Sequence, residues 1–322
     1  MRRLLVGLVL VGVIASNGAM GQSQYPAGTV RIIVPSSPGA TTDVLARLIA
    51  QGMTQSWSQP VIVENRPGAD ETIGVQAAAK AAPDGHTLLV TSNAAITAAP
   101  HLHSRLGYDP QKDLTPILVL GQVTPVMNVP ASLPVKSVQE FIELEKAKPG
   151  ALNYGSFGNG TYAHVAMEEF KRRTGTQMVH IPYRGATPAI TALLRGEISL
   201  LITNLGSIAP HVNAGKVRTI ASVGAQRPSM RPDLPTVAES GLPGFSTGAW
   251  WGLYGPANLP RPIFDKIRAE AVRILNAPEA RKLFETNTFE LMQKSPDEFA
   301  QFIREDLDNW GKQIQAAGIK PD

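Results

Sequence analysis

Apolar runs of strand length alternate along the chain with stretches whose apolar residues recur every three to four positions. The first pair consists of the β-branched run 30–34, which Pro35 ends, and a stretch from Asp43 whose apolar side chains share one helix face. A loop of small and polar residues, 36–42, joins the two. Alternation of this kind predicts an α/β protein with doubly wound, mainly parallel sheets and flanking helices.

The same alternation continues to the end of the chain. Ser137 is the expected cap of one helix, and Pro188 is expected to open another. We expect further strands at 61–65, 87–91, from 152, 178–182, 198–202 and 217–223, and helices at 71–81, 138–148, 162–173, 189–195, 262–276, 278–287 and 296–317.

Two extended runs predict a division into two domains. The run 117–129 is longer than the other expected strands, and we interpret it as a crossing from one domain to the other. The aromatic stretch 250–256 is interpreted as the return. A chain of 322 residues is long enough for about two domains. The predicted domains are residues 22–122 together with 248–322, which include the helical tail, and residues 123–247.

The amino terminus has the pattern of a cleavable signal peptide. Arg2 and Arg3 precede the apolar run 4–14, and Ala19 and Gly21 are the small residues of a cleavage site, which predicts a signal peptide over 1–21. The apolar run is shorter than the roughly 20 residues that span a bilayer. The chain has no cysteine, so it has neither the lipid attachment site of a lipoprotein nor a disulfide. We therefore expect a periplasmic protein that is not embedded in a membrane.

Composition and charge exclude some partners. The chain is 43% hydrophobic, 6% aromatic and 17% charged, which is ordinary for a globular protein. The formal net charge of +4 falls by two when Arg2 and Arg3 are removed with the signal peptide. This small, scattered charge argues against a nucleic acid or a membrane surface as partner.

Four loops share a composition that suits anion binding. Each follows an expected strand and is rich in Gly, Ala, Ser or Thr, and at least three open helices; they are 36–42, 92–95, 156–161 and 183–187. Unpaired N–H groups and about half a positive charge at a helix start attract carboxylates or phosphates. If two domains face each other with these loops inward, several donors converge on one cleft. The alternative for each loop is an ordinary turn with a capping residue.

The sequence favours no catalytic or cofactor site. The segment 155–160 is a permuted glycine pattern, not G-x-G-x-x-G, and there is neither a G-x-S-x-G elbow nor a P-loop. The six histidines lack the spacing of a zinc site, so we expect no metal and no cofactor. His164 either faces the cleft or makes a structural hydrogen bond. Trp250 and Trp251 either line a pocket or pack in a core or hinge.

Taken in order, the chain's motifs resemble one known family. Over essentially its mature length the chain is similar to Bug-type substrate-binding proteins of tripartite tricarboxylate transport systems. The motifs that carry the resemblance are VPSSPGATTD at 34–43, VENRPG at 63–68, PDGHT at 83–87, YDP at 108–110, DLTP at 113–116, NYGS at 153–156 with Gly158, Gly160 and His164, PYRG at 182–185, PTVAESG at 235–241 and WGL at 251–253.

The resemblance implies a two-domain periplasmic binding protein that closes over a small carboxylate held mainly by main-chain amides. It places Asp43 as an orienting cap for the first loop. Together with Ser92, from the loop pattern above, the implied ligand site comprises Gly39, Ala40, Thr41, Thr42, Asp43, Ser156, Gly158, Gly160, Thr161, His164, Tyr183, Gly185 and Asn204.

Three residues depart from the family pattern and bear on which ligand binds. Ala40 stands where a second glycine is usual, so a left-handed turn there is less accessible. Phe157 stands where a small residue is usual, and it either narrows the pocket or stacks on an aromatic ligand. Thr203 stands where many relatives have an acid, which argues against a ligand with an ammonium group.

We interpret the protein as a non-enzymatic periplasmic solute-binding protein. It is expected to capture a small organic acid and deliver it to the membrane permease subunits of a tripartite tricarboxylate transporter, with hinge closure coupling the two events. The alternatives are an enzyme acting on a small organic acid in the same cleft and a ligand sensor for signalling.

Overall fold

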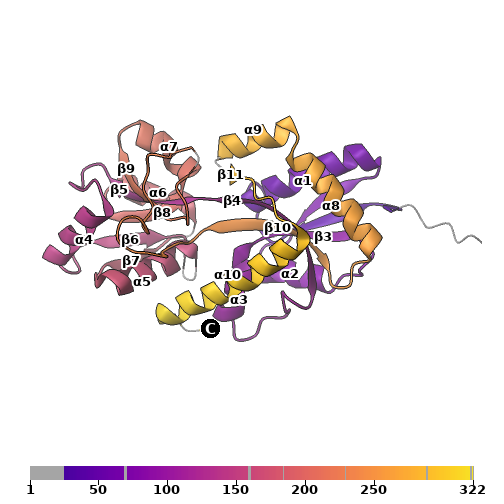
Figure 1. The fold of residues 1–322 in the computed structure, drawn as a ribbon, viewed down its shortest axis with the longest axis horizontal. Coiled ribbons are helices and arrows are strands. Elements are labelled where there is room, and N and C mark those ends of the chain that lie inside the picture. Colours follow the sequence, from indigo (N-terminus) through magenta and orange to yellow (C-terminus); the bar gives the residue numbers. More distant parts are fainter. Residues whose placement is uncertain are drawn as a thin grey trace, which may run out of the picture.

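The chain folds into two α/β lobes that lie end to end (Figure 1). The computed structural model describes residues 25–68, 71–158, 161–183, 185–228, 230–287, 289–319 and 321. The signal peptide expected at 1–21 lies outside these residues. Lobe 1 is the part built on a six-stranded sheet, and lobe 2 is the part built on a five-stranded sheet. The predicted two-domain α/β fold is confirmed, while the predicted domain boundaries stay a prediction.

The sheet of lobe 1 has the strand order β11-β4-β10-β3-β1-β2. β1, β2 and β3 are parallel, as the alternating pattern predicts, whereas β10 runs antiparallel to both β3 and β4. The strands are β1 (Val30–Val34), β2 (Val61–Asn65), β3 (Thr87–Ser92), β4 (Leu114–Val123), β10 (Ala249–Pro256) and β11 (Phe289–Glu290).

The sheet of lobe 2 follows the same logic in the order β7-β6-β8-β5-β9. β6, β7 and β8 are parallel, and β5 runs antiparallel to its neighbours β8 and β9. The strands are β5 (Pro125–Pro130), β6 (Asn153–Ser156), β7 (Val179–Pro182), β8 (Leu200–Asn204) and β9 (Val217–Ser222).

Most strands of each sheet run in one direction, as predicted, and the crossings explain why β5 and β10 run against them. The chain leaves lobe 1 at the end of β4 and enters lobe 2 at Pro125, which pairs with Asn204 at the carboxyl end of β8. It returns at Ala249, which pairs with Val123, and Trp251 then pairs with Ser92 at the carboxyl end of β3. A strand that arrives at the carboxyl edge of parallel strands has to run against them. The carboxyl edges of the two sheets consequently face each other across the crossings.

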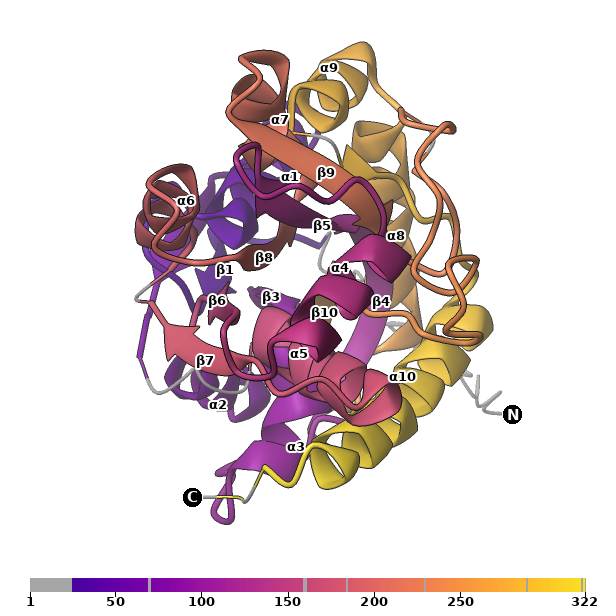
Figure 2. The ribbon, with the colours of Figure 1, turned by 90° about the vertical axis from the view of Figure 1, so that its left-hand side faces the viewer.

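Helices cover both faces of each sheet, and buried clusters identify which (Figures 1 and 2). In lobe 1, α1, α8 and α9 pack on one face, and α2, η1 and α10 on the other. In lobe 2, α4 and α5 pack opposite α6 and α7. The helices are α1 (Thr41–Trp57), α2 (Thr72–Ala79), the π-helical turn η1 (Ala94–Ala98), α3 (Ala99–Leu102), α4 (Val138–Ala147), α5 (Tyr162–Thr174), α6 (Ala186–Leu194), α7 (Leu205–Asn213), α8 (Arg261–Leu275), α9 (Pro278–Asn287) and α10 (Pro296–Ala316).

Local signals explain most helix starts, with a few differences. Ser137 caps α4 as predicted, since its hydroxyl accepts a hydrogen bond from the Glu140 amide at 3.1 Å. The helix predicted to open at Pro188 begins two residues earlier, because Gly185 is its N-cap with a φ of 103°. η1, α3, α7 and β11 are elements that the sequence pattern did not predict.

Candidate functional site

The start of α1 is held in place by Asp43. Its carboxylate accepts hydrogen bonds from the Gly39 amide at 2.9 Å, from Arg47 Nε at 2.8 Å and from Asn65 Nδ2 at 2.9 Å. These donors favour the charged form, the Arg47 contact most, and they lower the pKa of Asp43 to about 2. Asp43 is thus a buried charge whose partners belong to lobe 1, a geometry that suits the orienting role implied by the resemblance.

Gly39 and Ala40 have different backbone conformations in the turn before α1. Gly39 has a φ of 82°, the left-handed region that favours glycine. Ala40 is the N-cap of α1 with a φ of −69°, so alanine fits there without strain. The absence of a second glycine at this position therefore does not distort the loop. Thr41 and Thr42 form the first turn of α1, and the Trp251 indole N–H donates to Thr42 Oγ1 at 3.0 Å.

Ser92 lies at the carboxyl end of β3, next to the return crossing. Its hydroxyl donates to Glu71 Oε2 at 2.8 Å, and Thr91 Oγ1 donates to the same oxygen at 2.9 Å. Glu71 is the N-cap of α2 with a φ of 74°. Sequence reasoning missed this acidic residue, and its only sequence signal was its place at the start of an expected helix.

The glycine-rich loop of lobe 2 starts from a buried serine. Ser156 ends β6 and has no exposed surface. Its Oγ lies 2.7 Å from His180 Nε2, 3.0 Å from the Gly158 carbonyl oxygen and 3.2 Å from the Gly158 nitrogen. Thr161 is the N-cap of α5, and its hydroxyl also donates to the Gly158 carbonyl at 2.8 Å. Gly160, another predicted site residue, lies outside the described residues.

The remaining predicted residues lie at the same edge of lobe 2. Tyr183 follows β7, Gly185 caps α6 and Asn204 caps α7, so all three sit at strand ends that face lobe 1. The Tyr162 hydroxyl donates to Asn204 Oδ1 at 2.9 Å, and its ring packs against the core of lobe 1. Tyr162, which the sequence did not single out, therefore connects the two lobes at the start of α5.

His164 lies in the first turn of α5 and stacks on His180, with ring centroids 4.1 Å apart and planes 11° from parallel. Burial lowers its pKa. Phe157 packs within lobe 2 and meets Tyr162 edge to face at 5.7 Å. Thr203 is buried in β8.

The predicted residues that the structure describes thus form two facing groups, one on each lobe. The starts of α1 and of α5, α6 and α7 lie at the carboxyl edges of the two sheets, which face each other across the crossings. N–H groups at helix starts favour an anion. Groups of three or more His, Asp or Glu side chains arranged to hold a metal ion do not occur among the described residues.

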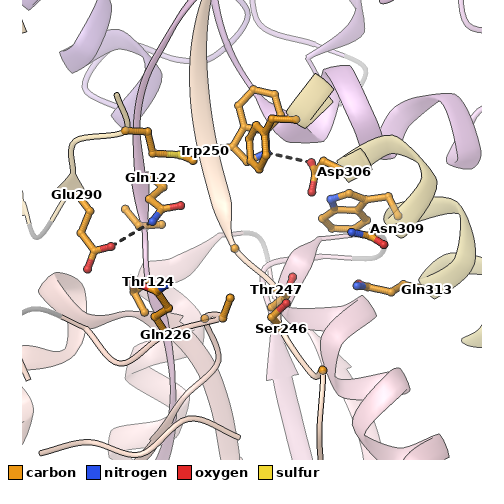
Figure 3. Close-up of a pocket in the computed structure, with 18 of the residues that line it drawn as sticks. Gln122, Thr124, Gln226, Ser246, Thr247, Trp250, Glu290, Asp306, Asn309 and Gln313 are labelled. Atoms are coloured by element: carbon orange, nitrogen blue, oxygen red, sulfur yellow. Dashed lines mark hydrogen bonds between the residues drawn. The ribbon is translucent and has the colours of Figure 1, made fainter. Parts of the chain in front are cut away.

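A cavity between the lobes adjoins the crossing segments (Figure 3). This hinge cavity, of about 630 Å³, is lined by the crossing segments 122–124 and 246–248, by the loop 224–227 and by residues of α10. Gln122, Thr124, Asn309 and Gln313 are among its polar side chains, and none of the predicted site residues lines it. Its lining comes from segments far apart in the sequence, which is why no sequence signal indicated it.

An acidic residue with a raised pKa lies at one wall of the hinge cavity. Asp306 accepts hydrogen bonds from Trp250 Nε1 at 2.9 Å and from Thr97 Oγ1 at 2.7 Å, and burial raises its pKa. Trp250 is buried and packs edge to face on Phe299 at 5.7 Å, while Trp251 lies in the core of lobe 1. Both tryptophans are thus packed in the core, and Trp250 also lines the hinge cavity.

Comparison with known proteins agrees with this architecture. The sequence model of the tripartite tricarboxylate transporter family receptor matches residues 45–319. The chain belongs to this receptor family. The protein BugT of Bordetella pertussis is 32% identical over 297 residues, which cover 92% of this chain and 91% of BugT.

Solved structures of similar proteins have the same fold. An R. palustris protein solved with adipate is 32% identical with a TM-score of 0.80, and the match covers 92% of this chain and all of that one. MatC from Rhodopseudomonas palustris, solved with malate, is 31% identical with a TM-score of 0.76 over 90% of this receptor and all of MatC. Among the described residues of this receptor, no helix combines the length and apolar character needed to cross a membrane.

Proposed function

We propose that this receptor is a periplasmic solute-binding protein that captures a small carboxylate between the facing loops of its two lobes. The observation that carries the proposal is the opposition of the sheets' carboxyl edges, which places helix starts of the two lobes opposite each other. The adipate and malate in the related structures support a dicarboxylate as the ligand class.

The proposed ligand contacts are the loop before α1 and the starts of α5, α6 and α7. A hydrogen bond to a charged acceptor contributes roughly 1.5–3 kcal/mol. Three or four of them reach the roughly −8 kcal/mol of a micromolar site, so no arginine clamp is needed. The signal peptide expected at 1–21 supports export, and the family supports delivery to tripartite transporter permease subunits.

Calorimetric titration of the mature chain with adipate, malate and citrate tests this function. Binding of at least one of these acids, with no binding of the neutral diamide of adipate, is the expected result. Recovery of the ligand unchanged, followed by NMR, separates a carrier from an enzyme. Conversion of the bound acid, or a failure of every carboxylate to bind, would contradict the proposal.

A further inference from the structure

His180 occupies a stacked position between two rings. It lies on β7 and pairs with Tyr154 on β6 in parallel register. The Tyr154 ring stacks on it at 4.8 Å and 14°, and the His164 ring at 4.1 Å and 11°. With both faces of the imidazole covered, its ring nitrogens are left at the edge, and Nε2 lies 2.7 Å from Ser156 Oγ.

Hydrogen-bond counting at Ser156 assigns the donor in this contact. A hydroxyl donates once and accepts twice. The Ser156 hydroxyl has the Gly158 carbonyl as an acceptor at 3.0 Å and the Gly158 amide as a donor at 3.2 Å. All three contacts are satisfied together when His180 carries its proton on Nε2 and donates to Ser156 Oγ. The other neutral tautomer would take the Ser156 proton away from the Gly158 carbonyl.

This contact reaches the start of α5 through Gly158. Gly158 has a φ of 131°, a conformation that side-chain-bearing residues rarely adopt. Its carbonyl oxygen accepts from Ser156 Oγ and from Thr161 Oγ1, and Thr161 is the N-cap of α5. A chain of contacts therefore runs from His180 through Ser156 and Gly158 to Thr161, the N-cap of this helix.

We propose that His180 is a positioning residue for Gly158 and Thr161 in the glycine-rich loop of lobe 2, acting through the hydroxyl of Ser156 and without touching the ligand. The part of this assignment that concerns affinity rests on the proposed function. The contact between His180 Nε2 and Ser156 Oγ involves no carboxylate. It therefore orients the loop without adding a charge to it.

Burial and the neighbouring His164 keep His180 neutral. The titratable groups near His180 are His164, which belongs to the stack, and Glu168 and Lys171, which lie farther along α5. Lys171 forms an ion pair with Glu168 at 2.8 Å, and the Tyr154 hydroxyl donates a hydrogen bond to Glu168. Burial first, and then the neighbouring His164, lower the pKa of His180 to about 4. At neutral pH the imidazole is uncharged, as the assigned tautomer requires.

Three variants and one double variant test the proposal. His180→Phe retains a ring for the stack but removes both nitrogens, His180→Gln retains an N–H donor, and Ser156→Ala removes the acceptor. We expect His180→Phe and Ser156→Ala each to weaken binding of adipate or malate about tenfold. The double variant should be no weaker than either single one, because both remove the same contact. His180→Gln should recover most of the affinity.

Tyr154→Phe is the matched control, since it keeps the stacked ring and removes only the hydroxyl that bonds Glu168. It should bind within about twofold of the wild type. Additive losses in the double variant, or an unchanged affinity of His180→Phe, would overturn the proposal.

Two measurements without ligand test the positioning role of His180 independently of the proposed carboxylate binding. The imidazole ¹⁵N spectrum of the wild type should show the Nε2–H tautomer for His180. Hydrogen exchange at the Gly158 amide should be about tenfold faster in His180→Phe than in the wild type. The opposite tautomer, or unchanged exchange, overturns the positioning role even where no carboxylate binds. Failure of carboxylate binding with both signatures present overturns only the proposed function.

Discussion

The indole N–H of Trp251 donates a hydrogen bond to Thr42 Oγ1 over 3.0 Å, and both residues are buried. Trp251 belongs to the return crossing, and Thr42 to the first turn of α1. Asn93, which follows β3, reaches the same crossing by donating to the Gly248 carbonyl at 3.2 Å. The loops before α1 and after β3 are therefore hydrogen-bonded directly to the return crossing, about which the lobes would move.

Replacing Thr42 with valine tests the contribution of the Trp251–Thr42 hydrogen bond. The variant keeps the side-chain volume but leaves the buried indole N–H without its acceptor, which costs about 1–3 kcal/mol of unfolding free energy. Urea denaturation of the variant measures the loss, and Thr41→Val in the same turn is the control. Equal stability of Thr42→Val and the wild type would show that the hydrogen bond contributes nothing.

Asp43→Asn should alter the acid sensitivity of the fold. The pKa of Asp43 is lowered to about 2 in the folded state, below its ordinary value of 3.8, chiefly by the Arg47 hydrogen bond. Stability from this group is present above pH 4 and is lost as the pH falls toward 2. Urea midpoints measured from pH 5 to pH 2 should therefore fall less in Asp43→Asn than in the wild type. A parallel decline in both proteins would contradict the prediction.

His180 should contribute a proton linkage of the same sign at higher pH. Its pKa of about 4 lies below the 6.5 of an unfolded histidine, so the unfolded chain binds more protons between these values. Stability is lost as the pH falls from 6.5 toward 4. His180→Phe should show a smaller loss over this window in thermal melts, whereas Tyr154→Phe should keep the wild-type slope. An unchanged slope in His180→Phe would show that His180 does not carry this linkage.

Hinge closure should be visible in tryptophan fluorescence. Trp250 and Trp310 line the hinge cavity, which residues of both lobes bound, so their surroundings change when the lobes move. Saturating carboxylate should change the emission of the wild type. Trp310→Phe should lose a large part of that change, whereas Trp57→Phe should keep it, because Trp57 packs on Tyr25 and the core of lobe 1. Equal changes in the two variants would argue against closure about this hinge.

Local patterns predicted the parts of the fold that depend on local causes. Strand and helix periodicity located β1 to β3 and α1, and the hydroxyl of Ser137 marked the start of α4. The pattern missed α7, which contains Gly206 and Pro210, both poor helix residues. It also missed the reversed direction of β5 and β10, because that reversal follows from the way the two lobes are joined.

In the site, too, local features could be predicted and long-range contacts could not. Gly39, Ala40 and Asp43 could be placed together because they are neighbours in one loop. The contact of Ser156 with His180 depends on the register of β6 and β7, which pairs Tyr154 with His180 across 26 positions. The hinge cavity joins five separate segments, so only the folded chain shows it.

The central claim is that a carboxylate binds between the facing loops, and amide chemical-shift mapping tests it most directly. On titration of the ¹⁵N-labelled mature protein with adipate or malate, we expect the largest shifts at the amides of Gly39, Thr41, Gly158 and Gly185. Shifts confined to the hinge cavity, at Asn309 and Gln313, or no shifts at saturating acid, would contradict the account.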